Sequence, residues 1–140
     1  MRAEKENPVS EKIVFDSFAI LSFFKGEKGS KIVQDKIEQV QNGKLSGFIA
    51  AVNLAEIYYI IWREKGEEDA ETAAQSIKDW GVKLVSIDEN LAKEAGSIKA
   101  NHSLSLADAF AAAVTKNENA TLLTGDSEFK PLNDLSIQWL

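Results

Sequence analysis

Short apolar runs alternate with helical patterns along most of this 140-residue sequence, and this alternation constrains its fold more than any other feature. Between the runs, apolar residues recur at intervals of three and four, which predicts amphipathic helices. Strands that alternate with helices favour an α/β domain in which helices cover both faces of a parallel sheet. The expected strands are 13–15, 46–52, 82–87, 120–124 and 136–139, and the expected helices are 17–24, 30–42, 53–65, 68–80, 89–100 and 105–117.

The expected strands are apolar almost throughout, as the run ATLLT at 120–124 illustrates. Strands that are buried on both faces lose the alternation of apolar and polar residues seen in half-exposed strands. Glycines fall where helices should end, and Gly43 is the expected C-terminal cap of the helix 30–42. The pattern predicts one domain with five short strands.

Composition limits the chemistry that such a domain can perform. The sequence has no cysteine, which excludes disulfides, a thiol nucleophile and a cysteine-based metal site. His102 is the only histidine, and it is expected in a loop without a catalytic role. No apolar run reaches the roughly 18 residues needed to cross a bilayer, and the first twelve residues are too polar for a signal peptide. We therefore expect a soluble cytoplasmic domain over 13–140, preceded by a flexible extension over 1–12.

The net charge is −6, from 22 acidic and 16 basic residues. A negative net charge gives no general attraction to nucleic acid. A local basic patch can still bind nucleic acid when acidic residues elsewhere make the total charge negative. The most basic stretch lies between Lys25 and Lys44, and the most acidic lies between Glu67 and Glu71. Both stretches are typical of solvated helix surfaces.

Acidic residues follow the expected strands at one edge of the sheet. Asp16 ends the first strand, Glu56 lies just after the second, and Asp126 follows the fourth directly. Asp108 opens the helix that precedes the fourth strand. Ligands of open parallel sheets bind at the carboxyl ends of the strands, so this edge is the predicted site.

Each of these acids also has a purely structural interpretation. The segments 53–56 (NLAE) and 105–108 (SLAD) both match the capping box, in which an acid reaches back to the amide of the N-cap residue. Asp16 is suited to cap the helix that follows it, and Asp126 is suited to a turn. Asp88 and Glu89 follow the third strand, and for them a helix cap is the favoured interpretation.

Taken together, four carboxylates at one edge repel one another unless a cation neutralises them. Oxygen ligands without histidine or cysteine suit Mg²⁺ or Mn²⁺. Such an ion supports in-line hydrolysis of a phosphodiester by water. The acids therefore predict a metal-dependent phosphodiesterase.

Four segments give the sequence a resemblance to the PIN-domain ribonucleases, above all to the VapC-type toxins of prokaryotic toxin–antitoxin pairs. They are IVFDSFAILSFFKGE (13–27), VNLAEIYY (52–59), SLADAFAAAV (105–114) and ATLLTGDSEFK (120–130). The resemblance implies a parallel sheet in the order 3-2-1-4-5, flanked by helices on both faces. It also implies cleavage of RNA by a Mg²⁺- or Mn²⁺-dependent endoribonuclease.

The same resemblance assigns roles to the acidic quartet. Asp16 and Asp108 are the expected metal ligands, and Asp126 is a ligand directly or through water. Glu56 is expected to be a ligand or to orient the attacking water. All four are expected to be catalytic.

Polar residues beside the quartet match family positions that hold the carboxylates or the water network; these are Ser17, Asn53 and Thr124. Glu128 falls where many relatives have Asp, in the pattern Asp-x-Asp-Phe. Because Glu is one methylene longer, the sequence leaves the role of Glu128 in metal binding open.

The resemblance also implies partners, namely an RNA substrate, a cognate antitoxin and a second copy of the chain. Candidate phosphate contacts are Lys25, Lys28, Arg63 and Lys65, although these are equally typical of exposed helix surfaces. A further group of aromatic and apolar side chains belongs either to a surface that binds a partner or to the core. These residues are Phe18, Leu21, Phe23, Phe24, Tyr58, Tyr59, Trp62 and Trp80.

Two other classes of function compete with the nuclease. A catalytically silent module of the same fold would bind RNA or protein, and the four intact acids argue against it. A phosphatase of the haloacid-dehalogenase type needs Asp-x-Asp after the first strand, where this chain has Asp16-Ser17-Phe18. A glycine-rich phosphate loop is also missing from the sequence.

Overall fold

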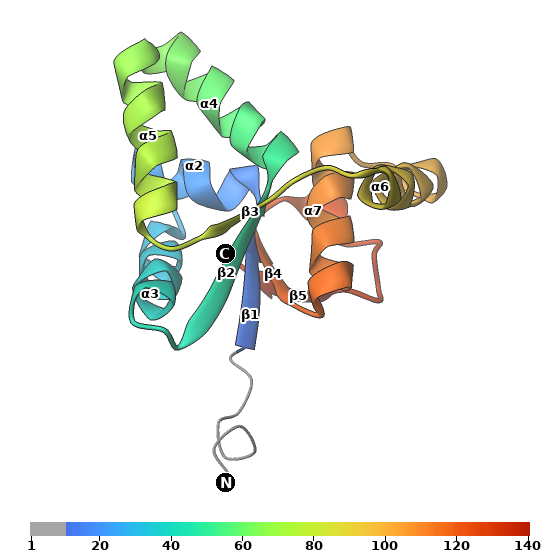
Figure 1. Cartoon of the computed structure of the whole chain (residues 1–140). Coiled ribbons are helices and arrows are strands. Elements are labelled where there is room, and N and C mark those ends of the chain that lie inside the picture. The colour runs from blue at the N-terminus through green and yellow to red at the C-terminus, as the bar shows by residue number, and fades with distance from the viewer. Residues whose placement is uncertain (1–10) are drawn as a thin grey trace, which may run out of the picture.

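A five-stranded parallel sheet forms the centre of the molecule in the computed structural model, which describes residues 11–140 (Figure 1). The strand order is β3-β2-β1-β4-β5, which confirms the predicted topology. The strands are β1 (Glu11–Phe15), β2 (Leu45–Ala50), β3 (Lys83–Val85), β4 (Thr121–Thr124) and β5 (Ser136–Trp139).

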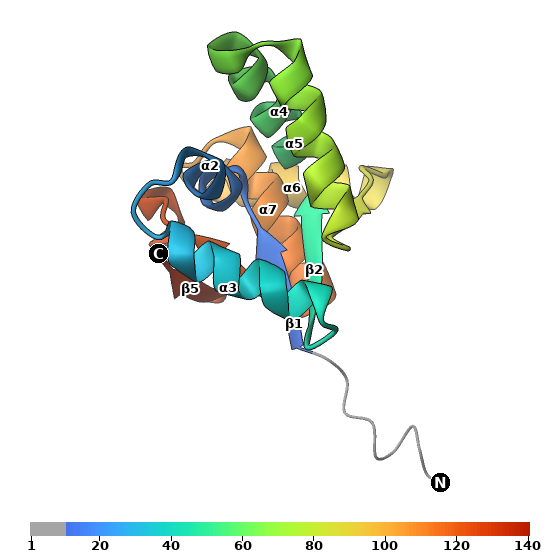
Figure 2. The same ribbon diagram turned by 90° about the vertical axis from the view of Figure 1, so that its left-hand side faces the viewer.

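Helices cover both faces of this sheet, as predicted. They are α2 (Ser17–Lys25), α3 (Ser30–Gln41), α4 (Ala51–Lys65), α5 (Glu67–Asp79), α6 (Glu89–Asn101) and α7 (Leu106–Glu118), with a short 3₁₀ helix, η1 (Ser127–Phe129), after β4. Helices α2 and α3 lie on one face, and α6 and α7 lie on the other (Figures 1 and 2). Helices α4 and α5 form a hairpin that extends beyond the carboxyl ends of the strands (Figure 2). No helix in the part of the chain that the structure describes has the length and apolar character to cross a membrane.

The hydrophobic core has two halves, one on each face of the sheet. Val14 and Leu122 pack with residues of α6 and α7, whereas Phe15 and Leu123 pack with residues of α2 to α5. All four of these strand side chains are fully buried. Neighbouring residues of a strand point to opposite faces, so a strand that is apolar throughout serves both halves of the core.

Most element boundaries lie within two residues of the predicted ones, but three differences matter. Strand β1 begins at Glu11, so the predicted extension over 1–12 is wrong at its last two residues, and the rest of it lies outside the described residues. Gly43 has a positive φ of 84° and lies one residue after Asn42, the cap of α3. Helix α4 begins directly after β2, at Ala51, so Asn53 lies inside the helix and does not cap it.

Candidate active site

Asp16 occupies the carboxyl end of the central strand β1 and begins helix α2. One carboxylate oxygen, Oδ1, accepts a hydrogen bond from the backbone N–H of Ala19 at 2.8 Å. The other, Oδ2, accepts a hydrogen bond from the hydroxyl of Thr124, at the end of β4. Asp16 is therefore an N-cap, as one interpretation of the sequence predicted, but its second oxygen faces the neighbouring strand.

Complete burial dominates the electrostatics of Asp16. Loss of solvation raises the pKa of its carboxyl to about 7, and the hydrogen bonds from Thr124 and Ala19 oppose this shift. Negative charge on Asp126 and Glu56 raises the pKa further. The protein itself therefore does not stabilise the charged form of Asp16 at neutral pH.

Asn53 lies buried in the first turn of α4 and joins three helices. Its amide nitrogen Nδ2 donates to Ser17 Oγ in α2 at 3.0 Å and to the carbonyl oxygen of Ala107 in α7 at 3.3 Å. Ser17 Oγ donates in turn to the carbonyl oxygen of Asn53 at 3.4 Å. Asn53 Oδ1 has no hydrogen-bond partner among the described residues. Ser17, Asn53 and Thr124 thus lie beside the acids, as the resemblance implied.

The structure contradicts the capping box predicted at 53–56 and shows one of the two bonds of the box predicted at 105–108. Glu56 is not part of a capping box, because α4 begins after Ala50, which makes no side-chain capping bond. Ser105 does cap α7, since its Oγ accepts from the N–H of Asp108 at 3.1 Å. The reciprocal bond is absent from Asp108: the N–H of Ser105 donates to Oε1 of Glu128 at 3.1 Å instead. The carboxylate of Asp108 is therefore left to face the site.

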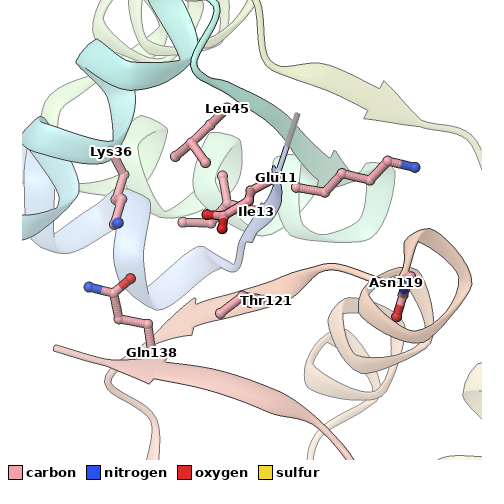
Figure 3. A pocket seen from close by; sticks show the side chains of 8 residues that line it. Glu11, Ile13, Lys36, Leu45, Asn119, Thr121 and Gln138 are labelled. Carbon is pink, nitrogen blue, oxygen red and sulfur yellow. The ribbon is translucent and has the colours of Figure 1, made fainter. Parts of the chain in front are cut away.

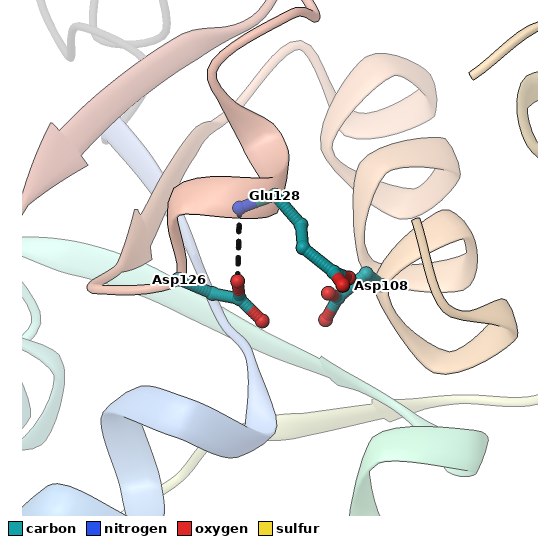
Figure 4. Close-up of side chains that lie close together, drawn as sticks. All are labelled: Asp108, Asp126 and Glu128. Atoms are coloured by element: carbon teal, nitrogen blue, oxygen red, sulfur yellow. Dashed lines mark hydrogen bonds between the residues drawn. The ribbon is translucent and has the colours of Figure 1, made fainter. Parts of the chain in front are cut away.

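Three carboxylates come together above the carboxyl ends of β1 and β4. Asp108, Asp126 and Glu128 each have an oxygen within 4.8 Å of the others (Figure 4). The N–H of Glu128 donates to Asp126 Oδ1 at 2.9 Å, so Asp126 caps η1, in agreement with its predicted place in a turn. The N–H of Asp126 donates to Thr124 Oγ1 at 3.0 Å, which links Asp126 to the hydroxyl that contacts Asp16.

The environment of Asp108 also opposes its negative charge. Burial raises the pKa of Asp108, and the adjacent carboxyl groups of Asp126 and Glu128 raise it further, together with the charge of Asp16. Within the described chain, no residue that lines this part of the surface is a lysine or an arginine. A divalent cation would supply the missing positive charge.

A cleft of about 320 Å³ opens over the carboxylates. Glu56 reaches it from α4 and Asp126 from the end of β4, whereas Asp16 lies beneath its floor with no exposed surface. The residues that line it are Ser17, Phe18, Leu21, Glu56, Ile60, Ser105, Asp108, Asp126 and Glu128. Three of the predicted quartet thus line one cleft, and Asp16 is buried beside it. Glu128 belongs to the closest group of carboxylates, and Glu56 does not.

The structure places Glu128 close to the acids. The sequence left its role in metal binding open, and its carboxylate lies beside those of Asp108 and Asp126. The signal was present in the sequence, because Glu128 stands two residues after Asp126 in the pattern Asp-x-Asp-Phe. Its contact with Ser105 had no signal in the local sequence.

The predicted phosphate contacts lie away from this cleft. Lys25 pairs with Glu64 at 3.3 Å, and both line a separate cleft that Lys65 shares. Arg63 lies over the ring of Tyr59, with its guanidinium carbon 5.1 Å from the ring centre. Lys28 is exposed in the turn after α2. A role for these cations in binding RNA stays a prediction.

A hollow at the opposite edge of the sheet has a different character (Figure 3). It has a volume of about 250 Å³ and lies at the amino ends of the strands, where Glu11 and Lys36 line it. Lys12, which also lines it, pairs with Glu118 at 3.4 Å. Charges of both signs are therefore mixed here, whereas the described charged residues that line the acidic cleft are all acids.

The remaining candidate residues are assigned as follows. Asp88 caps α6 by accepting from the N–H of Leu91 at 2.8 Å, which confirms the structural interpretation. His102 follows the end of α6, away from the acidic cleft. Phe23, Phe24 and Trp80 pack against one another at the edge of the core, whereas Phe18, Tyr59 and Trp62 are each more than 40% exposed.

The fold and the site together define an α/β domain with a carboxylate-lined cleft suited to a divalent cation. Residues 13–135 match the family model of the PIN domain. The match spans most of the chain, and the chain belongs to the PIN domain family.

Solved structures agree with this assignment of the fold. VapBC from Salmonella typhimurium bound to DNA superposes with a TM-score of 0.72 at 14% identity, covering 91% of this chain and 97% of that one. VapC20 from Mycobacterium tuberculosis, described as a sarcin-ricin loop cleaving toxin, gives a TM-score of 0.69 at 17% identity, covering 86% and 95%. VapBC2 from Rickettsia felis gives 0.69 at 16% identity, covering 91% and 97%. No curated protein sequence matches the chain.

Proposed function

We propose that this PIN domain is a metal-dependent endoribonuclease that hydrolyses RNA phosphodiester bonds and acts in the cytoplasm as the VapC-like toxin of a toxin–antitoxin pair. One observation carries the proposal: acidic side chains from three separate segments converge on a cleft that no described lysine or arginine lines. Burial and mutual repulsion raise the pKa of Asp16 and Asp108 there, which is a cost to the fold that a bound cation removes.

The residues fit Mg²⁺ or Mn²⁺, because every candidate ligand is an oxygen. Asp108 and Asp126 offer carboxylate oxygens in the cleft, and the buried Asp16 is close enough for its charge to raise the pKa of Asp108. When bound, the ion supplies positive charge that stabilises a phosphodiester under in-line attack by water. Glu56 lines the same cleft from α4 and would accept a hydrogen bond from the attacking water.

Ser17, Asn53 and Thr124 hold this arrangement in place. Thr124 donates to Asp16 and accepts from the N–H of Asp126, so one hydroxyl fixes two acids. Asn53 ties the starts of α2 and α7 together, and these helices carry Asp16 and Asp108 at their first turns. Without a bound cation, removing these bonds would let the carboxylates separate under their own repulsion.

One wall of the cleft is apolar and suits an unstacked base next to the scissile phosphate. Phe18, Leu21 and Ile60 form this wall, and the ring of Phe18 lies so close to Gly125 that a Cβ there would come within 2.4 Å of it. Bases of single-stranded RNA stack on aromatic rings of this kind. Lys25, Lys28, Arg63 and Lys65 would contact phosphates farther along the strand.

A protein partner is also part of the proposal. Several structures of the same fold are named as VapBC assemblies, in which a toxin of this kind is bound to an antitoxin. We propose a cognate antitoxin and a homodimer for this chain. Tyr59 and Trp62, exposed on α4, are suited to such an interface.

Cleavage of a mixed RNA pool by the purified protein tests the proposal. The reaction is run with Mg²⁺, with Mn²⁺ and with EDTA, and Asp108→Asn serves as the inactive control. Cleavage that needs metal and is lost in Asp108→Asn supports the nuclease and its site together. If the folded wild-type protein binds RNA without cleaving it under any metal, the proposal is wrong and the chain is a silent binding module.

A further inference from the structure

We propose that Glu128 is a positioning residue that fixes the start of α7, so that the carboxylate of Asp108 stays free for the metal. The inference rests on the proposed function and assigns to Glu128 a task different from metal binding. It follows from the way in which the capping box of α7 is divided between two segments.

In a complete capping box, the acid at the third helical position accepts from the N–H of the N-cap residue. Asp108 has this position after Ser105, and its own N–H donates to Ser105 Oγ at 3.1 Å. The second bond of the box goes elsewhere, because Ser105 N–H donates to Glu128 Oε1 at 3.1 Å. Glu128 thus performs the task that would otherwise hold Asp108 against its own helix.

Glu128 is also fixed at its backbone. Its N–H donates to Asp126 Oδ1 at 2.9 Å, and the side chain then extends to α7. One residue therefore sets the spacing between Asp126 and Asp108, whose oxygens lie within 4.8 Å of each other. Residues that orient metal ligands through hydrogen bonds affect metal affinity although they do not touch the ion.

The length of the side chain matters for this role. Glu128 lies on η1, and its side chain extends toward Asp108 on α7 (Figure 4). Its carboxylate accepts there from the N–H of Ser105. Aspartate is one methylene shorter and would leave that N–H without its acceptor. Glutamine keeps the length and an acceptor oxygen but removes the negative charge. The two substitutions therefore separate the hydrogen bond from the charge.

The test measures Mn²⁺ binding by titration calorimetry and thermal melting in EDTA for the full chain and for Glu128→Gln and Glu128→Asp. We expect Glu128→Asp to bind Mn²⁺ about ten-fold more weakly than the wild type, and Glu128→Gln to bind it more tightly than Glu128→Asp. In EDTA, Glu128→Asp should melt below the wild type because it loses the bond and keeps the charge. Glu128→Gln should melt at or above the wild type because it keeps the bond and removes a repelling carboxylate.

A direct metal ligand would give the reverse order. If Glu128→Gln binds Mn²⁺ more weakly than Glu128→Asp, or melts below it in EDTA, the inference is wrong. Equal binding by the wild type and both variants also overturns it and leaves the nuclease proposal intact. A wild-type protein that binds no Mn²⁺ contradicts the proposed function itself, and the inference fails with it. The same two substitutions at the exposed Glu27, at the far end of α2 from Asp16, control for general effects of the change.

Discussion

The starts of α2 and α6 have the same local structure and serve different purposes. Asp16 and Asp88 each follow a strand, each has an extended backbone, and each accepts a hydrogen bond at 2.8 Å from the N–H three residues later. Asp88 is exposed on the edge of the molecule. Asp16 is completely buried, with its second oxygen held by Thr124 and other carboxylates nearby.

The comparison shows that a helix cap does not exclude the catalytic role that we propose for Asp16. Capping uses one oxygen of Asp16, and the other accepts from Thr124, whose hydroxyl also accepts from the N–H of Asp126. What distinguishes the two residues is the surroundings: β1 is the central strand, so its carboxyl end meets α4, α7 and β4, whereas β3 is the edge strand that leads to Asp88. The ionised form of Asp16 loses its solvation on burial, whereas the carboxylate of the exposed Asp88 stays in contact with water.

The largest expected effect is on the rate of RNA cleavage, and it distinguishes Asp16 from Asp88. Asp16→Asn should reduce RNA cleavage at least about hundred-fold, because it removes a charged oxygen from the proposed metal site. Asparagine is also a good N-cap, so α2 should persist. Asp88→Asn is the matched control and should cleave at the wild-type rate. Initial rates in Mg²⁺, with circular dichroism to check folding, decide the comparison; equal loss in both variants would mean that capping alone matters.

The second prediction concerns stability without metal, where the two substitutions should act in opposite directions. Folding raises the pKa of Asp16 from 3.8 to about 7, so the folded state binds more protons than the unfolded state between these values. Stability in EDTA should therefore fall as the pH rises from about 4 to about 7. A shift of this size corresponds to on the order of 4 kcal/mol once Asp16 is ionised.

Thermal melts in EDTA at pH 5 and pH 8 measure this effect. Asp16→Asn should melt at least about 5 °C above the wild type at pH 8, and the difference should shrink at pH 5. Asp88→Asn should melt slightly below the wild type, because it loses a negative charge at a helix N-terminus that is worth roughly 0.3–1 kcal/mol. A lower melting temperature for Asp16→Asn at pH 8 would contradict the account of its burial.

The resemblance to the PIN-domain family implied the strand order. Sequence patterns predicted the edge at which the acids gather, because each acid lies near the end of an expected strand. They also predicted the caps made by Asp88 and Ser105, which depend only on residues within one helical turn. Asn53 was misplaced because the spacing Asn-x-x-Glu imitates a helix start. The backbone instead passes from β2 into α4 without a loop, and this buries Asn53 between helices.

The bond between Glu128 and Ser105 could not be predicted in the same way. The two residues are 23 positions apart, and their contact depends on how η1 folds back over the start of α7. The pattern Asp-x-Asp-Phe drew attention to Glu128, but it describes spacing along the chain and not reach in space. We therefore expect contacts between segments to decide which carboxylate binds a metal and which one positions another.

The smallest expected effect concerns the hydroxyl that distinguishes Asp16 from Asp88. Thr124 donates to Asp16, and this bond lowers the pKa of the carboxyl against the effect of burial. Thr124→Val removes the donor at similar volume, so the pKa of Asp16 should rise further above 7. The acidic limb of the pH–rate profile should then move to higher pH by about one unit or less, with cleavage largely restored at alkaline pH. Thr121→Val, at the other end of β4, removes a hydroxyl that contacts Ser136 at 3.0 Å and should leave the profile in place. If Thr124→Val lowers the rate equally at every pH, Thr124 acts on the geometry of the site and not on the charge of Asp16.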